Sequence, residues 1–223
     1  MSKKKQVIIF GTSSFAEIVD VYLTADSPYE VVAFTVHKQY IKESRFRGKI
    51  VTPFETLVKS YPPDRYDMFV AVGYSKLSRA RTEIYEQCKA SGYKMVQYIN
   101  SKALHWGETK VGDNVFILEN NVIQPFVEIG NNTILWSGNH IGHHSIIGNN
   151  VFMSSQIVIS GNCRVGDNCF IGVNAAVADN VTIAPFSFIG MSAVITKDTI
   201  EKGVYKGPKS VAELYNTDEM RGL

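Results

Sequence analysis

The sequence has little charge imbalance and no long apolar run. Its 23 Lys and Arg residues and 21 Asp and Glu residues leave a formal net charge of +2, so nothing predicts a surface for nucleic acid. No stretch approaches the roughly 18 consecutive apolar residues of a membrane helix. The apolar run after the basic start MSKKKQ is only VIIF, which is shorter than the apolar core of a signal peptide. We therefore expect a cytoplasmic protein without a membrane span.

Cysteine is also scarce. The three cysteines, Cys88, Cys163 and Cys169, form no Cys-x-x-Cys pair and predict no disulfide framework. A thiol can form an acyl-enzyme. However, Cys163 and Cys169 both fall on small-residue positions of the repeat described below, and Cys88 falls in a predicted helix. We therefore expect Cys163 and Cys169 to be core residues and Cys88 to be a surface or packing residue.

Residues 1 to about 100 alternate between predicted strands and helices. Apolar runs predict strands at 6–10, 30–36, 67–73 and 94–99, and helices are expected within 11–23, 53–61 and 78–92. Continuous apolar strands separated by helices are typical of a small parallel sheet with helices on its faces, here an α/β, Rossmann-like unit. Ligands bind at the carboxyl ends of such strands, which here are residues 11–15, 35–37 and 73–74.

A strict period of six begins at Val111. The residue at each sixth position is aliphatic in fifteen of fifteen cases: Val111, Ile117, Ile123, Ile129, Leu135, Ile141, Ile147, Met153, Ile159, Val165, Ile171, Val177, Ile183, Ile189 and Ile195. The position four residues further on is mostly small or β-branched. No α-helix buries one stripe at this period, whereas short strands that turn a corner every six residues do. Three faces close a coil of 18 residues and predict a parallel β-helix of about five coils, roughly 24 Å tall.

This tract resembles the hexapeptide-repeat acyltransferases. Together with the α/β half it resembles the NeuD- and PglD-type sugar acetyltransferases of bacterial surface-glycan pathways such as lipopolysaccharide synthesis. The resemblance implies an acceptor-binding domain at 1–104 and a left-handed β-helix with a closing loop at 105–223. It also implies a homotrimer with active sites in grooves between neighbouring β-helices, and acetyl-CoA as the donor. The acceptor would be an amino or hydroxyl group of a sugar, nucleotide-linked in most of the family.

Three of the five histidines lie within five residues, in the stretch HIGHH. Acetyl transfer from a thioester requires the acceptor to lose a proton, and histidine suits that role at neutral pH. The family segment hydrophobic-x-His-acid-x-x-Ile-Gly corresponds to IGHHSIIG, so the resemblance assigns the general base to His143, expected on an outward position of the strand that contains Ile141. His144 stands where the family has an acid. His140 is a further candidate for relay or acceptor binding.

The resemblance also assigns residues to the donor. The backbone N–H of Gly161 would stabilise the oxyanion, and Val173, Gly190 and Met191 would line the CoA arm. Lys206 and Lys209, in the stretch KGPKS, would lie near the CoA phosphates.

The acceptor site would begin at the turn FGTSSFAE, where N–H groups at a helix start favour a diphosphate. Its candidate residues are Gly11, Ser13, Ser14, Phe15, Thr35, Gly73 and Arg81. Two departures stand out, since the family commonly has Gly-His-Gly where this chain has Ser14-Phe15-Ala16, and acidic residues where it has Thr35-Val36-His37. They indicate a different nucleotide, a changed pose or a non-nucleotide acceptor.

Two other classes of function remain open. The γ-class carbonic anhydrases bind zinc through three histidines on the same type of fold, but His105, His140 and His144 are each spaced one residue short of that pattern, and one residue reverses the side of a strand. We therefore expect no metal. A non-catalytic trimer that binds sugar nucleotides is the other alternative.

Overall fold

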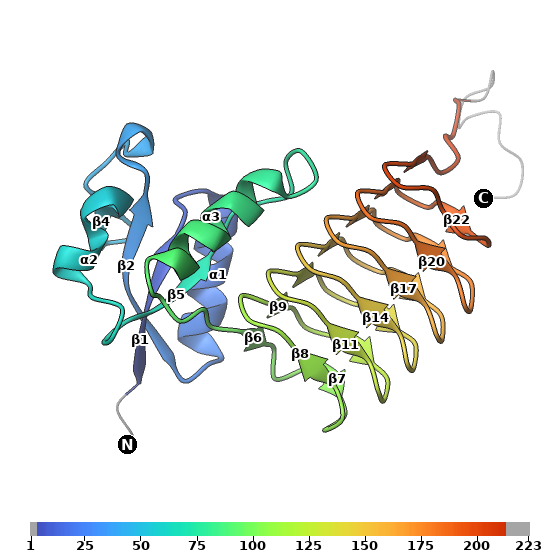
Figure 1. The fold of residues 1–223 in the computed structure, drawn as a ribbon, viewed down its shortest axis with the longest axis horizontal. Helices are drawn as coiled ribbons and strands as arrows, with labels where there is room; N and C mark the ends of the chain where they lie inside the picture. Colours follow the sequence, from blue (N-terminus) through green and yellow to red (C-terminus); the bar gives the residue numbers. More distant parts are fainter. Residues whose placement is uncertain (1–3, 213–223) are drawn as a thin grey trace, which may run out of the picture.

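The computed structural model describes residues 4–212, which form an α/β unit followed by a parallel β-helix (Figure 1). No helix within these residues is long and apolar enough to cross a membrane. The two predicted architectures are confirmed.

The α/β unit is built on a five-stranded sheet in the order β3-β4-β2-β1-β5. Strands β1 (Lys5–Phe10), β2 (Tyr29–Val36), β4 (Lys49–Pro53) and β5 (Asp67–Val70) are parallel, and β3 (Arg45–Phe46) is antiparallel to β4. The short β3–β4 hairpin was not predicted, because its RFRGKIV segment lacks a long apolar run. Its strand β4 lies beside β2, and its residues line a cavity described below.

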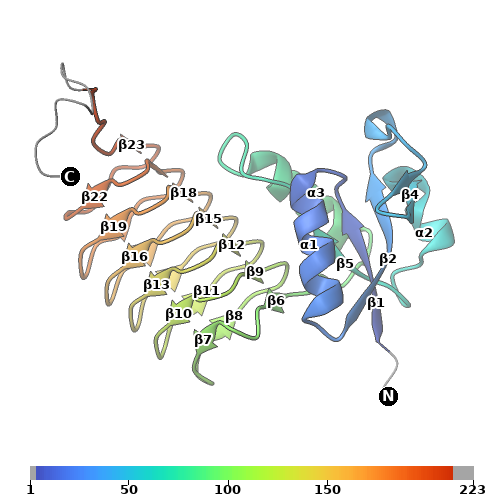
Figure 2. The ribbon, with the colours of Figure 1, turned by 180° about the vertical axis from the view of Figure 1, so that it is seen from behind.

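Helices α1 (Ser14–Ala25) and α3 (Arg79–Ala90) flank β5 near the first coils, with α3 in front in Figure 1 and α1 in front in Figure 2, whereas α2 (Leu57–Ser60) lies at the other end of the sheet. Short 3-10 turns occupy Lys38–Tyr40 and Phe54–Thr56. The helix expected within 53–61 is present only as two short pieces, the 3-10 turn at Phe54–Thr56 and α2. Pro53 belongs to β4, so no helix begins before Phe54.

The strand expected at 94–99 is wrong as a strand of this sheet. Met95 makes only an isolated bridge to Met68, and β6 (Tyr98–Ile99) pairs with the β-helix instead. The apolar residues of this run are buried in two places. Met95 and Val96 complete the α/β core, whereas the ring of Tyr98 packs against that of Phe116, with 5.0 Å between ring centroids.

The β-helix consists of two-residue strands that pair with strands one coil away. Its strands are β6, β7 (Leu104–His105), β8 (Lys110–Val111), β9 (Phe116–Ile117), β10 (Val122–Ile123), β11 (Glu128–Ile129), β12 (Ile134–Leu135), β13 (His140–Ile141), β14 (Ile146–Ile147), β15 (Phe152–Met153), β16 (Val158–Ile159), β17 (Arg164–Val165), β18 (Phe170–Ile171), β19 (Ala176–Val177), β20 (Thr182–Ile183), β21 (Phe188–Ile189), β22 (Val194–Ile195) and β23 (Val204–Tyr205).

Three parallel sheets form the faces of the coil. We call them the β12 sheet (β6, β9, β12, β15, β18, β21, β23), the β13 sheet (β7, β10, β13, β16, β19, β22) and the β14 sheet (β8, β11, β14, β17, β20). Stacked positions are 18 residues apart, as for Asn114 and Asn132. The first strand of the stack lies at Tyr98–Ile99, ahead of residue 105.

The interior is filled by the aliphatic column and by a second column of small residues. Every member of the aliphatic column except Val111 is buried. Polar members of the second column are paired with backbone carbonyls, as Ser145 Oγ is with Ser160 O at 3.0 Å. Cys163 and Cys169 are fully buried, and burial raises the pKa of Cys169 to about 11. These thiols are core residues and inert as nucleophiles.

Each corner of the coil contains one residue in the left-handed region. Every sixth residue from Asn114 to Ser192 has a positive φ, and most of these residues are asparagine, the non-glycine residue that adopts this conformation most easily. The period of six in asparagine was a second signal of the same fold, and it marks the corners rather than the faces.

The α/β unit and the β12 sheet share one hydrophobic core. The outward side chains of Phe116, Ile134 and Phe152 belong to the same buried cluster as the strands of the α/β sheet. Polar contacts fix the same interface, since Asn114 Oδ1 accepts a hydrogen bond from Val70 N at 2.8 Å. The position of the α/β unit relative to the coils is therefore set by packing.

Replacing Ile183 with alanine should lower the free energy of unfolding by about 2–5 kcal/mol, because the side chain is fully buried in the coil interior. Thr182, its neighbour on the same strand, is exposed, and Thr182→Ala should change stability by less than about 0.5 kcal/mol. Urea denaturation of the two variants measures this. Equal effects would contradict the assignment of inward and outward positions.

Asp26 joins α1 to the start of the β-helix. Its Oδ2 accepts hydrogen bonds from Ser101 N and Tyr98 Oη, both at 2.8 Å. The hydrogen bond from Ser101 makes the largest contribution to lowering the pKa of Asp26, and the bond from Tyr98 lowers it further. The native pKa then lies below the ordinary value of about 3.9, so the stabilisation is complete above that value and is lost as the pH falls through the native pKa.

Asp26→Asn should therefore be less stable than the wild type by about 1 kcal/mol at pH 7, and the difference should shrink below about pH 4. Thermal unfolding between pH 3 and pH 7 tests this. Asp64→Asn, an exposed acid between α2 and β5, is the control and should follow the wild type. A difference that is constant with pH would show that the carboxylate charge is not involved.

Candidate active site

His143 and His144 occupy a corner of the coil. They lie in the turn between β13 and β14, so the expectation that His143 sits on the strand of Ile141 is wrong. Only His140 and Ile141 remain in the strand, because each six-residue unit keeps two residues for pairing and uses the others to turn. The turn exposes both imidazoles to solvent.

The two imidazoles are hydrogen-bonded to each other through Nδ1, at 3.1 Å. One Nδ1 must donate and the other accept, so the pair shares one proton between these atoms. His144 is held by its left-handed backbone, with φ of 59°, and by ring contact with Phe126 at 4.7 Å. The hydrogen bond between the two Nδ1 atoms turns Nδ1 of His143 toward His144 and leaves Nε2 of His143 for another partner.

Gly161 lies on the next coil beneath the His143 ring. A Cβ built at Gly161 would be 2.8 Å from both Nε2 and Cε1 of His143. The bare α-carbon is therefore what allows this edge of the imidazole to lie against the backbone. His143 N also donates to Gln124 Oε1 at 2.9 Å, which fixes the turn from the preceding coil.

The N–H of Gly161 is already bound. It donates to Asp179 Oδ1 at 2.9 Å, and Asp179 is the residue one further coil along the same corner. The carboxylate stands where an oxyanion would approach this N–H, and like charges repel. The oxyanion role expected for Gly161 stays a prediction, and it requires the Asp179 side chain to turn away.

His140 lies away from this corner. It projects from the outer face of the β13 sheet, in register with Val122 and Val158, and is half-buried. The same outer column continues with Leu104, Ala176 and Val194, of which Leu104 and Val194 are 53% and 71% exposed. His140 thus lies within an apolar stripe and forms no hydrogen bond with the His143–His144 pair.

The expected donor residues gather at another corner. Val173 and Met191 are exposed in successive turns between the β12 and β13 sheets, and Ser192 N donates to Val173 O at 2.8 Å. Gly190 N donates to Tyr205 O at 2.7 Å, next to Lys206. Lys206 and Lys209 are exposed in the segment after β23. Val173, Gly190, Met191 and Lys206 therefore come together, but at the opposite edge of the β13 sheet from His143.

The α/β unit holds a crevice of about 560 Å³ at the carboxyl ends of β1, β2 and β5. Gly11, Ser13 and Gly73 line it, as expected from their strand ends. Gly11 has a φ of 133°, and a Cβ there would meet Ala71 O at 2.6 Å, so only glycine lets the turn approach β5. Thr12 and His37, from the strand ends 11–15 and 35–37, also line it, together with Tyr40 and Lys42, which the sequence did not single out.

Four expected acceptor residues lie elsewhere. Phe15 is buried against Phe116 and Trp136 at 5.9 and 6.1 Å, and so belongs to the core. The Thr35 hydroxyl is fully buried and donates to Thr52 O at 2.7 Å. Ser14 begins α1 and is exposed outside the crevice lining.

Arg81 is the fourth. Its side chain is fully buried and donates to Asn150 O at 2.9 Å and Val151 O at 3.2 Å on the β-helix. Burial lowers the pKa of Arg81 to about 9, which still leaves it charged at neutral pH. The expectation that Arg81 binds the acceptor is wrong, because its guanidinium joins α3 to the coils.

The three histidines of the zinc alternative are not assembled. His105 is in register with Ile123, on the inward column, whereas His140 is in register with Val122, on the outward one. Neighbouring positions of a strand point to opposite faces. Within residues 4–212 no three His, Cys, Asp or Glu side chains are grouped so that they could hold a metal ion.

Residues 108–143 and 162–197 match the family model of the bacterial transferase hexapeptide (six repeats). The β-helix is built of hexapeptide repeats. The predicted left-handed hexapeptide coil is thereby confirmed. No curated protein sequence matches the chain.

Solved structures share the whole two-part fold. A perosamine N-acetyltransferase from Caulobacter crescentus, in complex with CoA and GDP-perosamine, is 21% identical over 91% of this chain and 93% of its own, with a TM-score of 0.80. The acetyltransferase domain of PglB from Neisseria gonorrhoeae, in complex with acetyl coenzyme A, is 23% identical over 92% and 97%, with a TM-score of 0.80. WeeI from Acinetobacter baumannii is 18% identical over 90% and 96%, with a TM-score of 0.76. At these identities the likeness is one of fold.

Arg81→Met should lower the free energy of unfolding by about 2–3 kcal/mol, because two buried carbonyls lose their donor. Arg79, exposed with its guanidinium 5.6 Å from the Phe186 ring, is the matched control, and Arg79→Met should cost no more than about 1 kcal/mol. Chemical denaturation measures both. A stable Arg81→Met protein with weakened binding of nucleoside diphosphates would restore the phosphate role.

Proposed function

We propose that this protein transfers the acetyl group of acetyl-CoA to an amino or hydroxyl group of a nucleotide-linked sugar, with His143 as general base. The observation that carries the proposal is the imidazole arrangement. His143 is exposed at a coil corner, its Nδ1 is engaged by His144, and its Nε2 lies beside Gly161, where the absence of a side chain makes room for the imidazole.

The chemistry is a direct transfer. The acceptor amine or hydroxyl attacks the thioester carbonyl carbon, and its proton passes to Nε2 of His143. A carbon–nitrogen or carbon–oxygen bond forms, the carbon–sulfur bond breaks, and the departing thiolate takes the proton from the imidazolium. When His143 Nδ1–H donates its hydrogen bond to His144 Nδ1, Nε2 of His143 carries no proton and can accept one. His144 thereby holds His143 in the tautomer that a general base requires.

A direct route also agrees with the cysteines. Cys163 and Cys169 point into the core, and burial raises the pKa of each thiol. Cys88 is fully buried in α3, where burial raises its pKa to about 12. A thiol must be ionised and accessible to act as a nucleophile, so an acyl-enzyme on any of the three is disfavoured.

The crevice of the α/β unit supports a nucleotide-linked acceptor. It lies at the carboxyl ends of parallel strands, the usual ligand position in such sheets. Ser13 begins the turn into α1, where free N–H groups favour a phosphate. Lys42 lines the crevice and supplies the cation that Arg81 does not. Two solved relatives of the same fold were crystallised with GDP-perosamine and with acetyl coenzyme A, which supports the pairing of acceptor and donor.

We also propose a homotrimer. His143 and the expected donor residues lie at opposite edges of the β13 sheet, so one chain does not bring them together. The outer face of that sheet carries an apolar column, with Leu104, Val158 and Val194 each more than two-fifths exposed. Packing this face against neighbouring copies would bury the column and bring the His143 corner of one chain beside the donor corner of the next.

The test is release of free thiol from acetyl-CoA against a panel of UDP-, dTDP- and GDP-linked amino sugars. His143→Gln should lower kcat by about 10²-fold or more with the accepted sugar, because proton removal from the acceptor is lost. His105→Gln, an exposed histidine on β7, is the matched control and should stay within about twofold of the wild type.

Unchanged turnover in His143→Gln would exclude it as the base and direct attention to His140 or His144. Binding of CoA and nucleotides without any turnover would favour a non-catalytic nucleotide-sugar-binding trimer. Turnover only with sugars that lack a nucleotide would show that the α/β crevice serves another purpose.

A further inference from the structure

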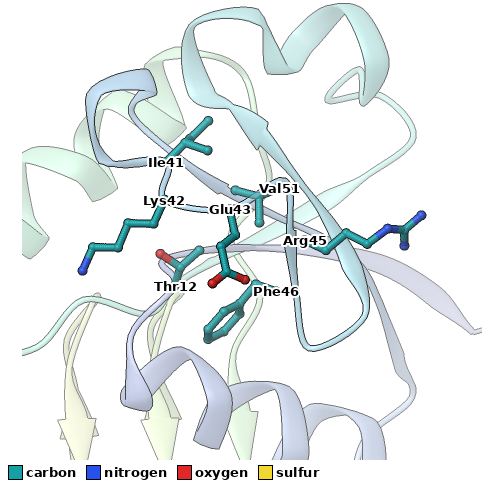
Figure 3. A pocket seen from close by; sticks show the side chains of 7 residues that line it. All are labelled: Thr12, Ile41, Lys42, Glu43, Arg45, Phe46 and Val51. Carbon is teal, nitrogen blue, oxygen red and sulfur yellow. The ribbon is translucent and has the colours of Figure 1, made fainter.

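A second cavity of about 240 Å³ opens beside the crevice and is lined by Thr12, Ile41, Lys42, Glu43, Arg45, Phe46 and Val51 (Figure 3). Its walls are largely apolar, since Ile41, Phe46 and Val51 contribute their side chains. Figure 3 shows the Phe46 ring and the Glu43 carboxylate directed into the same space, with the Thr12 hydroxyl beside them. The cavity therefore combines a flat apolar wall with one acid.

Glu43 has no partner within residues 4–212, where neither a hydrogen bond nor an ion pair involves its side chain. The nearby cations are engaged or point elsewhere. Arg45 donates to Gly48 O at 2.7 Å, and Figure 3 shows it directed away from the cavity. Arg47 and Lys49 are both paired with Asp20, at 2.6 and 3.0 Å. The carboxylate is thus available to a ligand.

The cavity is continuous with the crevice, because Thr12 and Lys42 line both. A diphosphate bound at the turn before α1 would let the rest of the nucleotide extend through both the crevice and the cavity. The sugar would extend toward the β5 side of the crevice, where Gly73 lies, and the base would enter the Glu43 cavity. A planar base would lie against the Phe46 ring, which suits stacking.

The acid distinguishes among bases. A carboxylate accepts hydrogen bonds only, and its two oxygens fit two adjacent donors. Guanine presents such a pair, its ring N1–H and its 2-amino group. Uracil and thymine present one ring N–H between two carbonyl oxygens, which a carboxylate repels, and adenine presents its amino group beside a bare ring nitrogen.

We propose that the cavity beside Glu43 binds the base of the acceptor nucleotide and that Glu43 selects guanine. The acceptor would therefore be a sugar linked to guanosine diphosphate. This inference rests on the proposed function, since it takes the crevice as a site for a nucleotide-linked acceptor. It adds the identity of the nucleotide and the residue that reads it.

The test compares binding of GDP, IDP, UDP and dTDP to the full chain by calorimetry, for the wild type and for Glu43→Gln. IDP differs from GDP only in lacking the 2-amino group. The wild type should bind GDP at least tenfold more tightly than the other three, and Glu43→Gln should lose at least tenfold toward GDP and little toward UDP. The mutation should also reduce the difference between GDP and IDP, because the partner of the 2-amino group is altered.

Glu30→Gln, an exposed acid at the amino end of β2, is the matched control and should bind GDP as the wild type does. Melting temperatures of both variants should equal that of the wild type, which excludes misfolding as the cause. Binding of UDP or dTDP in preference to GDP, or unchanged GDP affinity in Glu43→Gln, would overturn the role of Glu43 and leave the acetyltransferase proposal standing. Failure of all four nucleotides to bind would overturn both the inference and the nucleotide-linked acceptor.

Discussion

The structure depends on a backbone constraint at the corners of the coil. A chain that must turn after every two paired residues needs one residue per corner in the left-handed region, and the column of positive φ values from Asn114 to Ser192 provides it. Because the turns from Tyr98 to Ile195 have the same length, position n stacks on position n + 18 throughout that stretch. This register determines which side chains meet, and the column of His143, Gly161 and Asp179 at one corner is its product.

The corner that contains His143 and His144 differs from most other corners in its residue types. His144 adopts the left-handed conformation that asparagine adopts at most other corners, and it is held there by Phe126. An imidazole bonded to His143 can orient it but contributes no fixed negative charge, unlike a carboxylate. The carboxylate of this corner is instead Asp179, which is bound to the backbone N–H of Gly161. The role proposed for this corner therefore depends on the side chain of Asp179 as well as on the two histidines.

The interface between the two units decides which residues are free for ligands. Phe15 and Arg81 were both expected at the acceptor site. Both instead contact the β-helix, Phe15 through the ring of Phe116 and Arg81 through a hydrogen bond to Asn150 O. Residues that follow β2 line the two hollows instead, with Lys42 in both and Glu43 in the cavity beside the crevice. These residues come close to the α1 turn because the β3–β4 hairpin folds the chain back beside β2.

The sequence by itself determined the coil, because a period of six with aliphatic residues at every repeat satisfies only a structure that turns at that period. It also determined the parallel α/β sheet and the core role of Cys163 and Cys169. Gly11, Ser13 and Gly73 could be placed at the crevice because strand ends are a local property. The burial of Arg81, Phe15 and Thr35, the capping of the Gly161 N–H and the opening of Glu43 into a cavity were decided only by the tertiary structure. Each depends on contacts between segments far apart in the chain, and a local pattern carries no information about which partner will reach a given side chain first.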